Sequence, residues 1–209
     1  STWTRNGFNG NTSSGLYIYS AGAVSMKNIS ASGNGANGIY VDNRDGTSPA
    51  TYQSTGSAFH LTDNGSAGLY ILSNGNVTLN NQYGLNSDYN HGYYGIYIDN
   101  SSSSTPRYVK LINVRANNNN SDTLGDGLHV KSSGYIYASS LTADSNHGYG
   151  AYLLSNSGAV TIAGSNYFRD NGAVGLFANA DYGSVSLSNA VARRNGNYGV
   201  YLDAANGNI

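Results

Sequence analysis

Cysteine is absent from the 209-residue chain, so neither a disulfide nor a thiolate metal site can form. Charge is scarce as well: charged residues make up 10% of the sequence and the net charge is −1. A protein that tracks nucleic-acid phosphates needs clustered lysine and arginine. The balance of charges therefore argues against a nucleic-acid partner.

Long apolar runs and common catalytic motifs are also missing. No stretch of about 18 apolar residues occurs, which predicts that no segment spans a membrane. The sequence contains neither a Gly-x-Ser-x-Gly elbow nor a phosphate-binding Walker loop. No two of the four histidines have a metal-ligand spacing, so we expect neither a metal nor a cofactor. These histidines are His60, His91, His129 and His147.

What the chain does contain is a repeat. Eight times a glycine is followed by an apolar residue, a ring and usually a further aliphatic residue, with a mean period of about 26 residues. The glycines are Gly15, Gly38, Gly68, Gly95, Gly127, Gly150, Gly175 and Gly199. The repeat runs from end to end, which predicts one solenoid domain over residues 1–209.

Within one repeat, three short runs alternate with period two between polar corners. Residues 171–195 are the clearest example, with runs at 175–178, 183–187 and 190–195. The second run recurs as Val-x-aliphatic, for instance at Val77 to Leu79, which places aliphatic side chains inside and small polar ones outside. Three strands per coil and about eight coils predict an all-β parallel β-helix.

The corner before each glycine carries a polar signature. Asparagine stands four residues upstream of six of the eight glycines, and His91 and Thr123 take this place in coils four and five. Asparagine and glycine both tolerate a positive φ, so we expect them to form the turn. Equivalent asparagines in stacked coils are expected to form amide ladders. The six are Asn11, Asn34, Asn64, Asn146, Asn171 and Asn195.

The Asn-Gly-x-x-Gly-Ile-Tyr-Val unit, followed by Val-Thr-Ile and an Asn-rich corner, resembles the right-handed parallel β-helix of pectin-lyase-like proteins. The resemblance covers essentially the whole chain. It implies the fold but not an activity, because the same coil carries lyases, hydrolases, epimerases, tailspikes and surface proteins. Of the segments typical of polygalacturonase-like members, Asp-Asp, Gly-His-Gly and Arg-x-Lys do not occur here.

Calcium-holding carboxylates of the pectate-lyase type have three candidates, Asp42, Asp99 and Asp203. Each stands one residue after the strand triplet, but the nearest two are two coils apart, about 10 Å. That separation lies at the outer limit for a paired-carboxylate mechanism. We therefore assign no catalytic residue and expect a non-enzymatic protein.

The ring position of the repeat is the strongest binding candidate. If the flanking aliphatic residues face inward, the rings face outward and form one column with a spacing of about 4.8 Å. Such a column can stabilise itself and can also offer a contact surface for sugar or protein, since the two roles are compatible. Its members are Tyr17, Tyr40, Tyr70, Tyr97, His129, Tyr152, Phe177 and Tyr201.

Insertions supply a second set of candidates. Residues 42–57, 80–94, 100–106 and 117–126 depart from the minimal coil, and insertions in solenoids map to loops. From these loops we take Asp88, Tyr89, His91, Tyr93 and Arg107 as binding candidates, with Asp88, His91 and Arg107 as one cluster.

Residues 2–7 resemble the third strand of a coil, and residues 206–209 resemble the opening of a second strand. This predicts a segment of a longer β-helix or copies that stack end to end into filaments. The sequence therefore favours a structural or adhesive module, extracellular or on a cell surface, that self-associates. The alternative is a carbohydrate-active enzyme or a polysaccharide-binding module.

Overall fold

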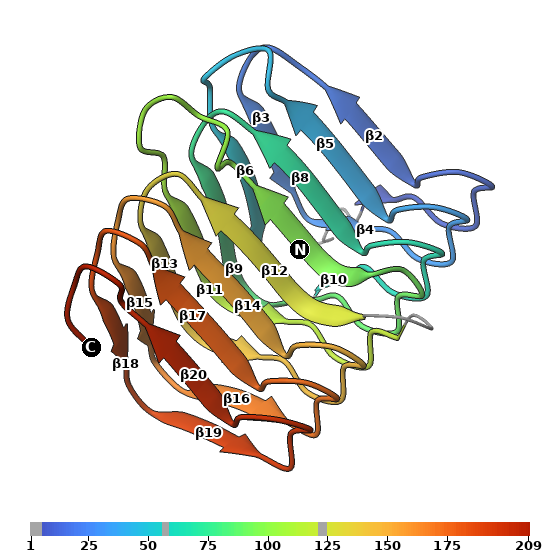
Figure 1. Cartoon of the computed structure of the whole chain (residues 1–209). Coiled ribbons are helices and arrows are strands. Elements are labelled where there is room, and N and C mark those ends of the chain that lie inside the picture. The colour runs from blue at the N-terminus through green and yellow to red at the C-terminus, as the bar shows by residue number, and fades with distance from the viewer. Residues whose placement is uncertain (1–5, 56–58, 121–124) are drawn as a thin grey trace.

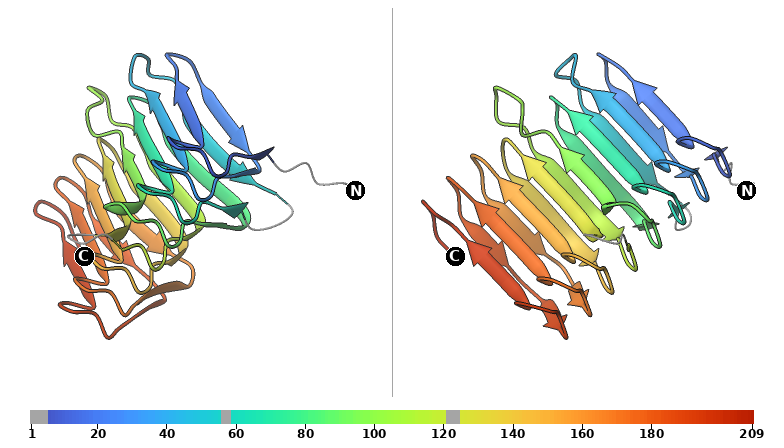
Figure 2. Two further views of the ribbon diagram at one scale, coloured as in Figure 1. Left: turned by 90° about the vertical axis from the view of Figure 1, so that its right-hand side faces the viewer. Right: turned by 45° about the vertical axis from the view of Figure 1, so that its right-hand side comes forward.

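The computed structural model describes residues 6–55, 59–120 and 125–209, and these form twenty β-strands and no helix (Figure 1). Within these ranges there is no helix that is long and apolar enough to cross a membrane. The strands wind into a parallel β-solenoid, and the coils stack from β2 at one end to β20 at the other (Figure 2). The predicted all-β parallel fold is confirmed.

The first sheet contains the Gly-x-ring strand of every coil. All its neighbours are parallel, and equivalent repeat positions are paired: Tyr40 lies opposite Tyr70, and Tyr152 lies opposite Phe177. Its eight strands define about seven turns. In spatial order they are β2 (Leu16–Tyr19), β5 (Ile39–Asn43), β8 (Leu69–Ser73), β10 (Tyr94–Asp99), β12 (Asp126–Ser132), β14 (Ala151–Ser155), β17 (Leu176–Ala180) and β20 (Val200–Asp203).

The second face is built by the Val-x-aliphatic strands. They are β3 (Val24–Lys27), β6 (Ala50–Ser54), β9 (Val77–Asn86), β11 (Val109–Arg115), β13 (Ile136–Thr142), β15 (Val160–Ala163) and β18 (Val185–Leu187). The third face contains β1 (Asn6–Gly7), β4 (Ile29–Ser30), β7 (Phe59–His60), β16 (Asn166–Arg169), β19 (Ala190–Arg193) and the second halves of β9, β11 and β13.

Three separate strands per coil occur only in the outer coils. In β9, β11 and β13 the second and third strands are continuous through a corner residue of positive φ, such as Asn113 (φ 51°) or Ser140 (φ 58°). Two of the predicted insertions contain parts of the regular coil and are therefore wrong in part. Residues 80–86 belong to β9, and β6 lies within residues 42–57. The sequence of β6 is largely polar, but its Ala50 and Tyr52 side chains face inward and are buried.

The interior of the coil is aliphatic, as the alternation predicts. Leu69 and Ile71 of β8 and Val77 and Leu79 of β9 are fully buried. Each coil contributes only a few such residues, and stacking joins them into one core. The Tyr52 hydroxyl lies in this core and donates to the Ile29 carbonyl at 2.6 Å.

A continuous asparagine ladder follows one corner through all eight coils. Each side-chain Nδ2 donates to the Oδ1 of the next asparagine at 2.8–3.1 Å. The assignment of His91 to the asparagine position of the corner in coil four is wrong, since Asn90 is the ladder residue there. Asn119 is the ladder residue of coil five, and Thr123 lies outside the described residues. In these two coils, insertions place the ladder asparagine more than four residues before the repeat glycine, so counting back four residues finds the wrong residue.

The glycines that follow the ladder are required for space and not for a left-handed turn. A Cβ on Gly38 would lie 2.6 Å from the Gly68 carbonyl oxygen and 2.8 Å from Nδ2 of Asn64. Neither these glycines nor the ladder asparagines have a positive φ, so that expectation is wrong. The residue before each ladder asparagine adopts this conformation instead, for instance Asp63 (φ 57°) and Tyr89 (φ 58°).

Candidate functional site

The eight predicted rings of the first sheet form one unbroken column. Successive centroids are 4.5–5.5 Å apart, and the ring planes of each pair are inclined by 20° or less. The parallel register of the sheet produces this stack, because each ring stands directly opposite its equivalent in the next coil. The strands that carry these rings form the front sheet of Figure 1, from β2 to β20.

Stacking determines which parts of these rings are accessible. Because the faces are turned toward one another, the sides of the column present ring edges and hydroxyl groups. Only the end rings have a face without a stacked partner in the described chain, and Tyr17 and Tyr201 are 65% and 40% exposed. Tyr97, in the middle, is only 9% exposed. The column is therefore not the uniformly open stripe that strand alternation alone suggests.

A second group of tyrosines covers parts of the column. The Tyr94 ring lies 4.8 Å from Tyr97 and 5.0 Å from His129, and Tyr149 meets Tyr152 edge-on at 5.5 Å. Tyr198 lies against Tyr201 in a similar way. These residues were not among the predicted site residues. The sequence feature that could have identified them is that each directly precedes a repeat glycine.

The imidazole of His129 interrupts the phenol stack and has one firm partner. Nδ1 lies 2.9 Å from Oδ2 of Asp126, whose other oxygen accepts the Tyr149 backbone N–H. Asp126 thereby orients the ring between Tyr97 and Tyr152. Nε2 is buried and has no hydrogen-bond partner among the described residues. This pair therefore fits a positioning role in the stack.

Burial affects the ionisation of the column. It raises the pKa of Tyr40, Tyr70 and Tyr152 above the usual tyrosine value. Burial also raises the pKa of Tyr97, and the charge of the nearby Asp99 carboxylate, which accepts a 3.1 Å hydrogen bond from the Tyr97 hydroxyl, raises it further. These phenols are neutral at physiological pH.

The carboxylates that follow the strand triplets are separated and locally engaged. Asp42 and Asp99 both stand opposite Leu72, on opposite sides of β8, and are therefore two coils apart. Arg44 donates to both oxygens of Asp42 and holds the pKa of that carboxyl below its usual value. Asp99 accepts from Tyr97 and from the Ser101 hydroxyl at 2.6 Å. Asp203 stands opposite Asn179, in the last coil.

The loop candidates do not gather at one place. Asp88 is buried, accepts the Asn117 backbone N–H at 2.9 Å and pairs with Arg115 at 3.3 Å, a residue not singled out from the sequence. Burial raises the pKa of Asp88 in spite of that partner. Tyr93 is exposed, and its ring centroid is 6.3 Å from that of Tyr94. Arg107 lines a depression with Tyr108 and Tyr135.

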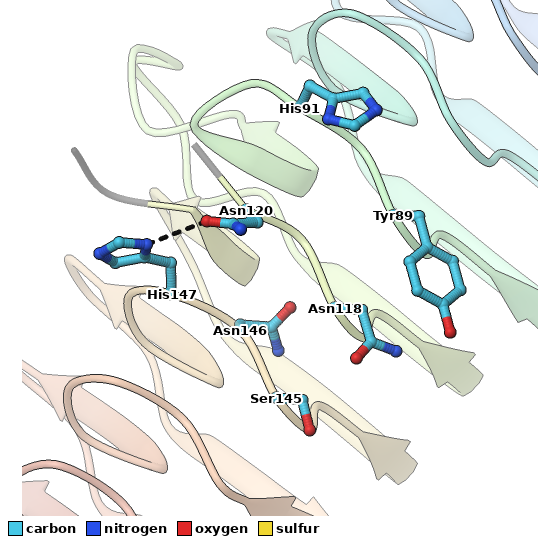
Figure 3. Close-up of a pocket in the computed structure, with 7 residues that line it drawn as sticks. All are labelled: Tyr89, His91, Asn118, Asn120, Ser145, Asn146 and His147. Carbon is cyan, nitrogen blue, oxygen red and sulfur yellow. Dashed lines mark hydrogen bonds between the residues drawn. The ribbon is translucent and has the colours of Figure 1, made fainter. Parts of the chain in front are cut away.

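Tyr89 and His91 border a groove of about 410 Å³ on the ladder corner (Figure 3). Its residues come from three successive coils, and only His147 and Asn120 are linked, by a 2.9 Å contact between Nδ1 and Oδ1. The complete lining is Tyr89, His91, Asn118, Asn120, Ser145, Asn146 and His147. His91, Asn120 and His147 follow successive ladder asparagines, where outer coils have glycine, for instance Gly65 and Gly172.

Across the described residues, no three histidine or carboxylate side chains are grouped so that they hold a metal ion. With the geometry established, the comparisons with known proteins identify the family. A family model described as "right handed beta helix region" matches residues 50–209, about three quarters of the chain. The chain belongs to the right-handed β-helix family. Comparison with curated proteins and with solved structures gave no significant match.

Membership of the right-handed β-helix family gives the handedness of the coil, as the sequence resemblance predicts. It covers the aromatic column from Tyr70 to Tyr201 and the ladder from Asn64 to Asn195. The family description names a fold and no reaction. The function of the chain must therefore be argued from its surface chemistry.

Proposed function

We propose that this β-helix is a non-catalytic structural or adhesive module, extracellular or on a cell surface, that associates with other copies. The observation that supports this most is the aromatic column. Sugar recognition by a ring needs an open ring face, whereas seven successive stacked pairs occupy the faces here. Each such pair contributes about 0.5–1.5 kcal/mol beyond its buried area. The column therefore acts first as a stabilising spine.

The carboxylates support a non-catalytic role. Four of the five described ion pairs join an Asp to an Arg on the same or an adjacent coil, and the fifth is the His129–Asp126 contact. Asp42 and Asp99 lie two coils apart with separate partners. A typical glycoside hydrolase needs two carboxyl groups about 5–9.5 Å apart on either side of a sugar bond. That alternative is the second candidate.

Self-association rests on the ends of the column. Tyr17 and Tyr201 each have an exposed ring, and the outer edges of β2 and β20 have no neighbouring strand within the described residues. Stacking β20 of one copy on β2 of another would continue both sheet and column. This contact joins two different surfaces and does not close, so it produces a filament.

Electron microscopy and intact-mass measurement of residues 1–209 at micromolar concentration test this proposal. We expect unbranched filaments that the Tyr201→Lys variant abolishes, because a charge replaces the terminal ring. Tyr182→Lys is the control, since Tyr182 is also exposed but lies outside the column. Dispersed monomers at every concentration would contradict assembly. Release of reducing ends from an acidic polysaccharide would favour the enzyme instead.

A further inference from the structure

Tyrosine is the main oxidisable residue of this chain. The sequence has 19 tyrosines but no cysteine, one methionine and one tryptophan. The methionine, Met26, lies in the core and is only 3% exposed. The tryptophan, Trp3, lies outside the described residues. On the described surface, a one-electron oxidant therefore meets tyrosine before any other residue that gives up an electron readily.

Four phenols at one side of the column follow one another without interruption. Their successive ring centroids are 4.8, 5.4 and 4.6 Å apart, and the planes of each pair are inclined by 17° or less. Parallel rings in contact have overlapping π-systems, so an electron passes easily from one ring to the next. The run ends at His129, because an imidazole is harder to oxidise than a phenol. The four are Tyr17, Tyr40, Tyr70 and Tyr97.

The other side of the column is interrupted. Phe177 stands between Tyr152 and Tyr201, at 4.7 and 5.2 Å from their centroids. Its ring has no hydroxyl group and is much harder to oxidise than a phenol. His129 then separates Tyr152 from Tyr97. Only the side that begins at Tyr17 offers an unbroken series of stacked phenols that reaches Tyr97.

Tyr97 has the environment of a site that retains a radical. A phenol that loses an electron becomes a strong acid, so it needs a base that accepts its proton at once. Within the described column, only the Tyr97 hydroxyl donates to a carboxylate, Asp99 Oδ2 at 3.1 Å. Tyr97 is also 9% exposed, whereas Tyr17 is 65% exposed. An oxidant in solution therefore has access to Tyr17, while a reductant in solution has little access to Tyr97.

We propose that Tyr17, Tyr40 and Tyr70 conduct one-electron oxidation to Tyr97, which holds the resulting tyrosyl radical. The oxidant takes one electron from Tyr17 and is reduced, and each ring is refilled by its neighbour until Tyr97 has lost the electron. The O–H bond of Tyr97 breaks, and its proton passes to Asp99, which becomes a carboxylic acid. A neutral phenoxyl radical remains. This redox role does not depend on self-association.

A photosensitiser attached at one defined position tests the direction of transfer. Because the chain has no cysteine, a single Ser13→Cys or Asn197→Cys substitution directs a ruthenium tris-bipyridine label to one site. Both positions are exposed, and they stand four residues before Tyr17 and Tyr201, respectively. Flash excitation with methyl viologen as electron acceptor produces the one-electron oxidant Ru(III). The background is Trp3→Phe, so that tryptophan does not compete.

Electron paramagnetic resonance of freeze-trapped samples should show a tyrosyl radical with the label at position 13. High-field spectra should show a hydrogen bond to the radical oxygen, donated by the new carboxylic acid of Asp99. With the label at position 197, the radical at Tyr97 should be absent, because Phe177 and His129 interrupt the series. Equal yields of this hydrogen-bonded radical from both labels, or no trapped radical from either, would overturn the proposal.

Phenylalanine variants of the protein labelled at position 13 keep the stacked rings and remove single phenols. Tyr97→Phe should abolish the hydrogen-bonded radical, and Tyr70→Phe should slow its formation by at least about tenfold. Asp99→Asn should lower its yield, since an amide does not take up the proton. Tyr19→Phe is the matched control, because the Tyr19 hydroxyl also donates to a carboxylate, Asp45, but its ring lies outside the column. An undiminished signal in Tyr97→Phe, or an unchanged rate in Tyr70→Phe, would refute the proposal.

Discussion

Each amide in the middle of the asparagine ladder uses its full hydrogen-bonding capacity. In the buried Asn90, Oδ1 accepts from the backbone N–H and Nδ2 of Asn64, while Nδ2 donates to Asn119 Oδ1 and the Leu61 carbonyl. A fully satisfied polar network is tolerated in a core, whereas one missing member leaves several buried groups unpaired. The ladder is thus a structural requirement that no similar-sized apolar residue meets.

Replacing Asn90 tests the corrected ladder. Asn90→Ala should lower the free energy of unfolding by about 3 kcal/mol, because donors of Asn64 and the acceptor of Asn119 lose their partner without access to water. His91→Gly is the control, because Gly65 and Gly172 occupy this place in other coils, and it should change stability little. Urea unfolding followed by circular dichroism measures both. A larger loss for His91→Gly would restore the assignment that the glycine spacing predicts.

At the scale of the element, parallel register converts one ring per strand into a column. The residues that pair across β5, β8 and β10 are Tyr40, Tyr70 and Tyr97, and their centroids are 5.4 and 4.6 Å apart. The same register on the second sheet gives an uninterrupted stack only at Tyr108 and Tyr135, because the next coil carries Ala159. Whether a ring face is open therefore depends on the side chain one coil further on.

The partly buried phenols of the column make stability sensitive to alkali. Burial raises the folded-state pKa of Tyr40, Tyr70 and Tyr152 above the unfolded value of about 10. Their contribution is therefore complete below about pH 10 and is lost as pH rises through the folded-state pKa. The melting temperature should therefore fall as the pH rises above about 10.

Phenylalanine variants identify the source of that fall. The triple variant Tyr40→Phe, Tyr70→Phe, Tyr152→Phe retains the stacking and should lose much of the alkaline decrease. Tyr182→Phe is the control at an exposed site outside the column. If the triple variant is as sensitive to alkali as the unmodified protein, ionisation of the column is not the cause.

At the scale of the whole molecule, a solenoid is stabilised by contacts between neighbouring coils only. Leu128 and Val130 in β12 are almost fully buried between two coils, whereas Leu16 in β2 and Leu202 in β20 are only partly buried. The chain has no disulfide to tie its ends to the centre. Local opening should therefore begin at the end coils.

Hydrogen exchange of residues 1–209 tests this view. Backbone amides of β10 and β12 should exchange slowest and those of β2 and β20 fastest, because opening an end coil breaks contacts on one side only. Leu128→Ala should lower protection of β12 and of its neighbours β10 and β14, by about 2–5 kcal/mol. Leu202→Ala is the matched change near one end and should affect β20 and β17 alone. Uniform protection across all eight strands would contradict the nearest-neighbour description.

Much of the fold was predictable because each coil repeats the same alternation of inward aliphatic and outward polar or aromatic residues. Alternation predicted that Leu69 and Ile71 face inward and that Tyr70 faces outward, and a fixed period predicted the stacking of its ring on Tyr40. Counting back from the glycine failed at Asn90, where an insertion changes the spacing. Burial of Tyr97 was not predictable, because the Tyr94 ring that covers it belongs to the corner and not to the strand.

By itself the sequence determined the repeat, the inward and outward faces and the identity of the stacked rings, because these depend on local alternation and on one period. Only the tertiary structure decided which groups share a surface. The groove between Tyr89 and His147, the contact of Tyr94 with His129 and the pairing of Asp88 with Arg115 each join different coils. Their meeting depends on the exact length of each intervening corner, which insertions alter without changing the coil itself.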